Sequence, residues 1–256
     1  MPSAGVGAKA LRKENAWQPR PVSQAAYVHC LVTAGPTFEP IDQVRRLTNF
    51  STGRLGSELA ACLAAAGHQV TLLLGEQATW TNLPAAAVIE RFTTVADLEA
   101  RLRARAGTAV GAVFHAAAVG DFRCGSAYRR TEAGTLERLT AGKLSTRDGA
   151  VMLELIPTLK ILPNLRDWFP SARITGWKYE VDGDRPAALE RGRQQLGEAR
   201  SDACVVNGPA YGPGFGLVTP AGERDLVDRG KLFAALLRSV MPTPPTAGRW
   251  GAGLPL

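Results

Sequence analysis

The run YVHCLVTA, at residues 27–34, is apolar over the length of a β-strand. A helical pattern, LGSELAACLAAA, follows at residues 55–66 and ends before Gly67, and a second apolar run, QVTLLL, lies at residues 69–74. Continuous apolar runs of this length are typical of strands buried on both faces, as in parallel sheets that are covered by helices. The stretch therefore predicts the β-α-β start of an α/β domain.

The same alternation continues toward the C-terminus. Thr94 is a suitable N-cap for a further helix that has Asp97 in its first turn. Strands are expected at residues 87–92, 110–118, 151–156, 172–179, 203–207 and 215–219, and helices at residues 95–106, 184–199 and 230–240. We predict a doubly wound, mostly parallel (Rossmann-like) α/β sheet, whose ligand site lies at the carboxyl ends of its strands.

Residues 120–149 interrupt this pattern, because they contain charges and glycines but no clear period. A stretch of 30 residues without regular structure inside a compact domain is usually functional, so we expect a long central loop or flap. Both ends of the chain lack a sustained apolar period, and the last 15 residues hold four prolines and three glycines. We therefore expect flexible tails at residues 1–24 and 242–256 around one folded domain at residues 25–241.

The composition is that of an ordinary globular domain, with 256 residues of which 45% are hydrophobic and 21% charged. Neither a run of about 18 apolar residues nor the apolar core of a signal sequence occurs, so we expect a cytoplasmic protein without membrane contact. The four cysteines include no C-x-x-C pair, which argues against a zinc site or a disulfide framework. The net charge of +7 includes +3 from the first 25 residues and +1 from the last 15. The mildly basic remainder favours a phosphorylated small molecule over nucleic acid.

The segment STGRLG, at residues 51–56, lies at the start of the first predicted helix. Helix N-termini present free backbone N–H groups and a dipole that favours anions, so hydroxyls, glycines and an arginine there predict a phosphate cradle. The alternative is that these residues serve only as a helix cap and as closely packed glycines. The motif G-x-x-x-x-G-K-[ST] is absent, and the segment keeps only half of the dinucleotide fingerprint G-x-G-x-x-G, which supports a nicotinamide site only weakly.

Four more polar residues are candidates for chemistry. Arg45 and Asn49 lie in the loop before this segment and could face one pocket, as a fixed cation and a neutral amide. Asp121 follows the strand predicted at residues 110–118, where carboxylates often contact ribose or metal, although it could instead stabilise a turn. Lys143 lies in the central loop and, taken alone, is typical of a surface lysine.

Two longer motifs resemble one known family. The segments TAGPTFEPIDQVRRLTNFSTGRLG, at residues 33–56, and HAAAVGDF, at residues 115–122, resemble motifs of phosphopantothenoylcysteine synthetases, which belong to the DNA/pantothenate metabolism flavoproteins. A lysine-bearing loop and a strand that ends in VVN, at residues 205–207, follow in the family's order. The resemblance covers nearly the whole predicted domain, and it implies a ligase that joins 4′-phosphopantothenate to L-cysteine through an acyl-nucleotidylate, with release of pyrophosphate.

The resemblance also implies roles for residues of this chain. Lys143 would help to form the acyl-nucleotidylate, Asn49 would stabilise the acyl group while the amide forms, and Arg45 would bind the pantothenate end. Asp121 would contact either the nucleotide or a metal ion. The residues that would bind the nucleotide and its phosphates are Gly35, Ser51, Thr52, Gly53, Arg54, Ala118, Asp121 and Phe122.

The cofactors and partners follow from the same resemblance. It implies Mg²⁺ and a nucleoside triphosphate, either CTP or ATP, as co-substrate. We expect no flavin, because the short tail before the first strand leaves no room for a fused flavin domain. Family members form dimers in which the second chain lies near the substrate, so we expect a homodimer with the central loop as the contributing segment. Neither nucleic acid nor a membrane is an expected partner.

Two segments depart from the bacterial pattern of the family. KLSTRDG, at residues 143–149, keeps the first lysine and the last glycine of K-x-K-K-x-x-G but not the later lysines. GWKYE, at residues 176–180, is closer to the eukaryotic-type S-F-K-x-E-T than to the bacterial G-F-A-x-E-[ST]. The choice between CTP and ATP therefore stays open. The alternative functions are a nicotinamide-dependent oxidoreductase of similar fold and a non-catalytic nucleotide-binding relative, which the altered lysine loop would support.

Overall fold

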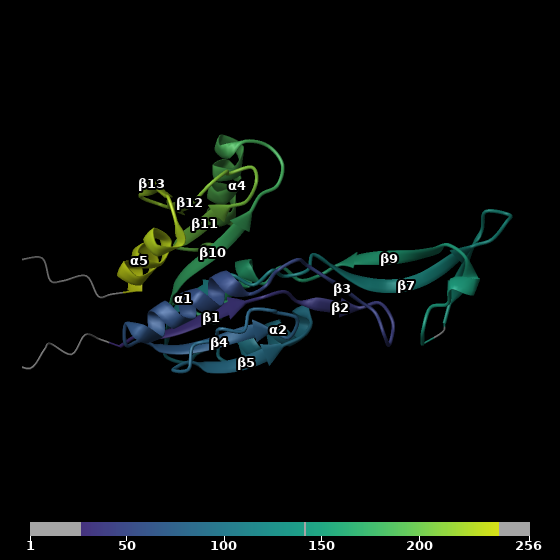
Figure 1. The fold of residues 1–256 in the computed structure, drawn as a ribbon, viewed down its shortest axis with the longest axis horizontal. Helices are drawn as coiled ribbons and strands as arrows, with labels where there is room; N and C mark the ends of the chain where they lie inside the picture. The colour runs from purple at the N-terminus through teal and green to yellow at the C-terminus, as the bar shows by residue number, and fades with distance from the viewer. Residues whose placement is uncertain (1–26, 141, 241–256) are drawn as a thin grey trace, which may run out of the picture.

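The computed structural model describes residues 27–140 and 142–240. The tails expected at residues 1–24 and 242–256 lie outside the described residues. Figure 1 shows a main sheet with helices on its faces and a narrow ribbon that extends away from it. Within the two described ranges, no helix combines the length and the apolar character needed to cross a membrane.

The main sheet has eight strands in the order β13-β12-β11-β10-β6-β1-β4-β5. The six strands from β11 to β5 in this order are parallel, whereas β12 and β13 are antiparallel to their neighbours. This arrangement confirms the doubly wound α/β fold. The bounds of the strands are β1 (His29–Ala34), β4 (Gln69–Gly75), β5 (Val88–Phe92), β6 (Val110–His115), β10 (Arg173–Tyr179), β11 (Ala203–Asn207), β12 (Phe215–Thr219) and β13 (Gly222–Leu226).

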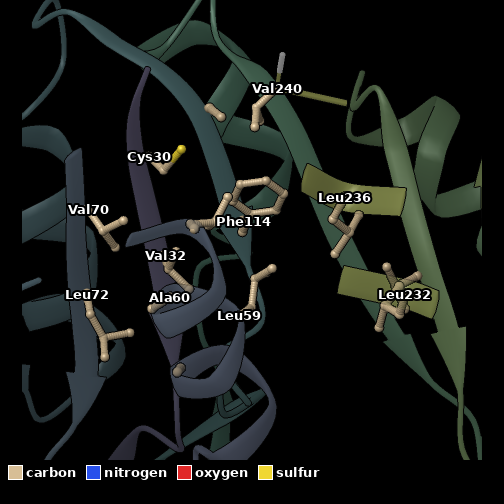
Figure 2. Packing of buried hydrophobic residues seen from close by; sticks show 14 of the residues in the cluster. Cys30, Val32, Leu59, Ala60, Val70, Leu72, Phe114, Leu232, Leu236 and Val240 are labelled. Atoms are coloured by element: carbon tan, nitrogen blue, oxygen red, sulfur yellow. The ribbon is translucent and has the colours of Figure 1, made fainter. Parts of the chain in front are cut away.

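Helices cover both faces of this sheet, because successive side chains of each buried strand point to opposite faces. α1 and α5 cover one face, where Leu59 of α1 and Leu236 of α5 lie on either side of Phe114 (Figure 2). α2 and α3 cover the other face around Leu31 and Ile174, and α4 extends that layer over β11 and β12. The helices are α1 (Arg54–Ala65), α2 (Val95–Arg103), α3 (Leu165–Trp168), α4 (Arg185–Glu198) and α5 (Arg229–Val240), with 3-10 turns η1 (Thr146–Asp148) and η2 (Leu162–Asn164).

The order in which strands are added reverses between β1 and β6. From β1 the chain adds β4 and β5 on one side, and it then returns to add β6, β10 and β11 on the other. The helices that follow β1 and β6 therefore lie on opposite faces of the sheet, α1 on one and η2 with α3 on the other. A crevice opens at the carboxyl ends of two strands whose connections diverge in this way, and ligands of doubly wound folds bind there.

The narrow ribbon, residues 36–50 and 120–158, is named the arm below. It consists of a β2–β3 hairpin and a three-stranded sheet in the order β8-β7-β9. Figure 1 shows β7 and β9 extending away from the main sheet, with β2 and β3 running toward the same side. The bounds are β2 (Phe38–Pro40), β3 (Arg46–Thr48), β7 (Phe122–Arg130), β8 (Leu136–Leu139) and β9 (Val151–Pro157). Exposed large apolar side chains gather on the arm: Val44, Leu47, Phe50, Phe122, Leu136, Met152, Leu153 and Leu155.

The arm corrects the expectation that residues 120–149 lack regular structure. They contain β7 and β8, and the strand expected at residues 151–156 is β9, which pairs with β7 and not with the main sheet. The sequence showed no period here because β7 has no fully buried side chain on either face. The β2–β3 hairpin and the edge strand β13 were also missed, since both are short and largely exposed.

The other predicted elements are confirmed, with small changes at their ends. The strand expected at residues 110–118 ends at His115, and the helix expected at residues 95–106 ends at Arg103. Thr94 is the N-cap of that helix, and its hydroxyl accepts the backbone N–H of Asp97 at 3.1 Å.

Candidate active site

A cleft of about 1290 Å³ lies at the carboxyl ends of β1, β6 and β10, at the reversal point of the sheet. Residues 49–56, 115–121, 159–163 and 177–179 line it, together with side chains of α4. Five of its lining side chains are cationic and two are acidic, so the cleft is suited to a phosphorylated ligand. These charged residues are Arg54, Lys160, Lys178, Arg191 and Arg229, against Asp121 and Glu198.

Glycine at position 53 sets the geometry of the side of the cleft where α1 begins. Gly53 is the N-cap of α1 and has φ 76°, in the left-handed region that glycine adopts readily. A Cβ atom at this position would lie only 2.9 Å from the Cβ of Ala78. Gly53 has no side chain with which to cap α1, and Oγ1 of Thr52 accepts only the N–H of Arg54, at 3.3 Å. The N–H groups of Leu55 and Gly56 are therefore left for an anion.

Two arginines border this side of the cleft. Glu58, in the second turn of α1, accepts hydrogen bonds from Nε of Arg54 at 2.7 Å and from Nη1 of Arg229 at 2.6 Å. The Arg54 guanidinium also stacks over the ring of Trp80, at 4.6 Å from its centroid. One carboxylate therefore holds two guanidinium groups, and one net positive charge remains beside the N-terminus of α1.

Asn49 is tied to the segment that follows β6. Its Nδ2 donates to the carbonyl oxygens of Ala118 and Val119, both at 3.3 Å. These two bonds occupy the amide nitrogen, so Oδ1 is the side-chain atom that remains for a ligand within the described structure. The arrangement brings Asn49 and the HAAAVGDF segment to the same cleft, as their motifs led us to expect.

Asp121 forms an ion pair with the ammonium group of Lys160, and both side chains are largely exposed. In the described ranges, no cluster of three or more His, Cys, Asp or Glu side chains could hold a metal ion. A single carboxylate that already faces an ammonium group is a poor donor set for a resident divalent cation. The residues present therefore do not fit a resident magnesium site.

His115, the last residue of β6, lies at the floor of the cleft and is only 6% exposed. Its Nδ1 is 2.9 Å from Oγ1 of Thr33 on β1. Burial lowers the pKa of His115 from 6.5 to about 4, because desolvation disfavours the charged ring. The imidazole is therefore neutral at physiological pH.

The wall of the cleft formed by β10 is fixed by polar contacts to α4. Glu180 accepts a hydrogen bond from Arg191 at 2.5 Å and pairs with Lys178 at 3.2 Å. Gln195 donates from Nε2 to the carbonyl oxygen of Trp177 at 3.1 Å. The GWKYE segment thus contributes to the cleft through a network that includes three charged side chains.

Arg45 and Lys143 lie on the arm, outside the residues that line the cleft. The Arg45 guanidinium is 2.7 Å from Asp42 and donates to the carbonyl oxygen of Leu144 at 3.0 Å. The backbone N–H of Leu144 in turn donates to Asp42 at 3.0 Å. These contacts hold the loop that carries Lys143 against the turn between β2 and β3.

The cleft brings together most, but not all, of the residues predicted from the sequence. Phe122 follows the lining residue Asp121, and the carbonyl oxygen of Gly35 accepts the N–H of the lining residue Ala118 at 2.9 Å, but neither Gly35 nor Phe122 lines the cleft itself. Of the residues that the sequence reasoning missed, His115 and Lys178 lay within quoted motifs, whereas Arg229 had no motif to mark it. The predicted residues that line the cleft are Asn49, Ser51, Thr52, Gly53, Arg54, Ala118 and Asp121.

Two curated proteins illustrate the relatives of this chain. It is 32% identical over 181 residues to the Coenzyme A biosynthesis bifunctional protein CoaBC of Thermococcus kodakarensis, covering 69% of this chain and 40% of the relative. It is also 32% identical over 196 residues to the CoaBC protein of Bacillus subtilis, covering 75% of this chain and 43% of the relative. The match therefore spans less than half the length of either relative.

Solved structures share the fold. The DNA/pantothenate metabolism flavoprotein from Streptococcus pneumoniae has a TM-score of 0.74 at 24% identity, covering 84% of this chain and 98% of that one. A mutant of Cab2 in complex with phosphopantothenate-cysteine has a TM-score of 0.61 at 18% identity, covering 83% and 85%. The family model of the DNA/pantothenate metabolism flavoprotein C-terminal domain matches residues 25–222. The resemblance noted in the sequence is thus confirmed, and the chain belongs to the DNA/pantothenate metabolism flavoprotein C-terminal domain family.

Proposed function

We propose that this chain is a cytoplasmic phosphopantothenate–cysteine ligase that uses CTP or ATP and acts as a homodimer. The observation that carries the proposal is one cleft that combines the N-terminus of α1, clustered cations and Asn49, in a chain of this family. A dehydrogenase would instead need a dinucleotide fingerprint, of which the sequence keeps only half.

The proposed reaction has two steps. First, a carboxylate oxygen of 4′-phosphopantothenate attacks the α-phosphorus of the nucleotide, and the bond to pyrophosphate breaks. Then the cysteine amine attacks the acyl carbon, the C–N bond forms, the nucleoside monophosphate leaves and the amine loses a proton to solvent. Charge accumulates on phosphate oxygens in the first step and on the acyl oxygen in the second, so fixed cations and hydrogen-bond donors near both stabilise the transition states.

Residues of the cleft suit the first step. The N–H groups at the start of α1 and the paired guanidinium groups of Arg54 and Arg229 would bind the triphosphate. Magnesium would enter as the metal of the nucleotide substrate, because the described residues do not form a resident site for it. Asp121, already paired with Lys160, would contact the nucleotide and not a metal ion.

The second step would depend on Asn49, whose amide lies at the junction of the β1 and β6 extensions. When the acyl-nucleotidylate binds there, the amide would orient its acyl group for attack by the amine. Lys143 and Arg45 would act from the arm of a second chain, since neither lines the cleft of its own chain. The apolar side chains exposed along the arm support a partner on that surface.

Pyrophosphate release tests the activity directly. The protein would be assayed with 4′-phosphopantothenate, Mg²⁺ and either CTP or ATP, first without and then with cysteine. We expect release with at least one nucleotide and amide formation only after cysteine is added. A folded dimer that releases no pyrophosphate with either nucleotide would refute the ligase.

Substitutions separate the proposed roles. Asn49→Asp should still release pyrophosphate but form no amide, whereas Lys143→Gln should block the first step. If each cleft uses Asn49 of one chain and Lys143 of the other, mixing the two variants, neither of which forms the amide, creates hybrid dimers with one intact site. About a quarter of the wild-type rate of amide formation then returns after random exchange. Mixtures that stay inactive despite verified subunit exchange would refute the shared site.

A further inference from the structure

One part of the cleft is built around Gly176 of β10, next to the side chain of Leu162. In the sheet, His115 of β6 is the register partner of Gly176 on β10. A Cβ atom at Gly176 would lie 3.1 Å from Nε2 of Gln195, which reaches over this position from α4. His115 and Gln195 therefore flank one glycine on the same face of the sheet, and both line the cleft.

The contacts of Thr33 determine which nitrogen of His115 carries the proton. The Thr33 hydroxyl accepts the backbone N–H of Ala117 at 3.2 Å, and Thr33 is fully buried. Within the described structure, Nδ1 of His115 is the partner that remains for the hydroxyl proton, so Nδ1 accepts it and Nε2 carries the ring hydrogen. Nε2 is not among the buried side-chain nitrogens that lack a partner, so it is the nitrogen that faces the cleft.

The contacts of Gln195 leave its side-chain oxygen, a hydrogen-bond acceptor, as the atom available to a ligand. Both hydrogens of Nε2 are directed to protein acceptors, the carbonyl oxygen of Trp177 at 3.1 Å and Sγ of Cys204 at 3.2 Å. Oε1 has no hydrogen-bond partner among the described residues, and it is not a buried unpartnered atom either. Gln195 therefore presents an acceptor to the cleft, beside the donor of His115.

A donor next to an acceptor is complementary to only some nucleobases. Cytosine and adenine each present an exocyclic amino donor beside a ring-nitrogen acceptor. Uracil and guanine present a carbonyl acceptor beside a ring N–H donor at the corresponding positions, so they would face donor with donor and acceptor with acceptor. Neither His115 nor Gln195 is charged, whereas Arg54 and Arg229 beside the N-terminus of α1 supply positive charge that suits phosphate.

We propose that His115 and Gln195 form a pair that reads the edge of the nucleobase and selects amino-bearing nucleotides, with His115 as donor and Gln195 as acceptor. This inference rests on the proposed function only in that the cleft binds a nucleoside triphosphate. Thr33 acts as a positioning residue, because it holds the imidazole in the tautomer that donates. The pair distinguishes CTP from UTP and ATP from GTP, and it leaves the choice between CTP and ATP to the size of the pocket.

Calorimetric titration of the intact wild-type protein with CTP, UTP, ATP and GTP, each as its magnesium complex, tests the pair without any substitution. Each mismatched edge replaces two hydrogen bonds by one donor–donor and one acceptor–acceptor contact, so we expect CTP to bind at least about 10-fold more tightly than UTP, and ATP than GTP. A purine nucleoside triphosphate without the 6-amino group should bind more weakly than ATP. Equal binding within both matched pairs would overturn the proposal, and so would a protein that binds none of the four.

A variant and a spectroscopic readout assign the effect to these residues. Gln195→Met keeps the length of the side chain but removes the acceptor, so the CTP:UTP affinity ratio should fall several-fold. Gln69→Met, at the exposed start of β4 and outside the cleft, should leave the ratio unchanged. ¹⁵N NMR of the wild type should show the Nε2–H tautomer of His115 and a shift of Nε2 when CTP is added. An unchanged ratio in Gln195→Met, or an Nδ1–H tautomer, would overturn the pair. Selective nucleotide binding without pyrophosphate release would refute the proposed ligase activity and still support the proposed role of His115 and Gln195.

Discussion

The buried neutral histidine at the floor of the cleft predicts an acid-sensitive fold. Burial lowers the pKa of His115 from 6.5 to about 4. Between pH 6.5 and pH 4, His115 is therefore protonated in the unfolded chain but not in the folded chain. The free energy of unfolding therefore rises with pH in this window, because the unfolded state binds more protons than the native state. The contribution of the neutral His115 ring to the free energy of unfolding is complete above pH 6.5. It declines as the pH falls toward 4 and is lost below that value.

The magnitude follows from the size of the shift. One pKa unit corresponds to about 1.4 kcal/mol, so the full contribution is about 3 kcal/mol and about 2 kcal/mol of it is lost between pH 7.5 and pH 5. Against a typical stability of about 5–15 kcal/mol, a loss of this size is easily measured. Burial also lowers the pKa values of His29 and His68, which adds a loss of the same sign. Only a comparison of two proteins isolates the part that belongs to His115.

The assay is urea unfolding of the wild type and of His115→Gln at pH 7.5 and pH 5. Glutamine cannot titrate, so the variant should lose about 2 kcal/mol less than the wild type over this interval, whatever its absolute stability. His29→Gln is the matched control, because His29 lies at the opposite end of β1 from the cleft and is partly exposed. Equal pH dependence in the wild type and His115→Gln, or an NMR titration of His115 near pH 6.5, would refute the reasoning.

Three further changes test the fold, the start of α1 and the arm. Gly53→Ala places a side chain at φ 76° and 2.9 Å from the Cβ of Ala78, so urea unfolding should show a loss of at least about 1–2 kcal/mol and pyrophosphate should bind more weakly. Wild-type stability and affinity would contradict this. Phe92→Ala removes a fully buried ring and should cost about 3–5 kcal/mol in the same assay, and a loss below about 1 kcal/mol would show that the core collapses to fill the cavity. Leu155→Glu puts a charge on the exposed apolar surface of the arm, so light scattering should show the monomer mass while urea stability changes by no more than about 0.5 kcal/mol, and a persistent dimer would contradict the role of the arm.

The main sheet could be predicted because its signal is local. β1 and β4 are continuous apolar runs, and Thr94 and Asp97 mark the start of α2 by their own side chains. The arm could not be predicted in this way, because most residues of its strands are exposed or only partly buried, and part of its pairing joins strands that are not consecutive in the chain. β7, for example, pairs with β9 across a gap that includes β8 and η1.

The same distinction applies to the candidate site: residues marked by the local sequence could be predicted, whereas residues placed by long-range contacts could not. Asn49 and the segment at residues 51–54 could be predicted because a helix N-terminus is visible in the sequence and a motif covers it. Arg229 could not, because its side chain is held at the cleft by Glu58, 171 residues away, and no pattern in the sequence links the two. His115 lay inside a quoted motif, yet its role depends on Thr33, which is its neighbour only once β1 and β6 have paired.

The contacts at the base of the arm decide how Lys143 could meet Asn49. If the arm of one chain bent back over its own cleft, it would have to break the hydrogen bonds that join the base of the arm to the main domain, at about 1 kcal/mol each. A total of about 5 kcal/mol would reduce the closed population by a factor of several thousand, whereas a second chain could present its Lys143 with these bonds intact. The arrangement with two chains is therefore favoured, and it predicts that an arm variant that stays monomeric loses pyrophosphate release as Lys143→Gln does. Five of these bonds run from the N–H of Thr37 to the carbonyl oxygen of Ala118, from the N–H of Phe38 to that of Thr93, from the N–H of Val95 to Glu39, and from Nδ2 of Asn49 to the carbonyl oxygens of Ala118 and Val119.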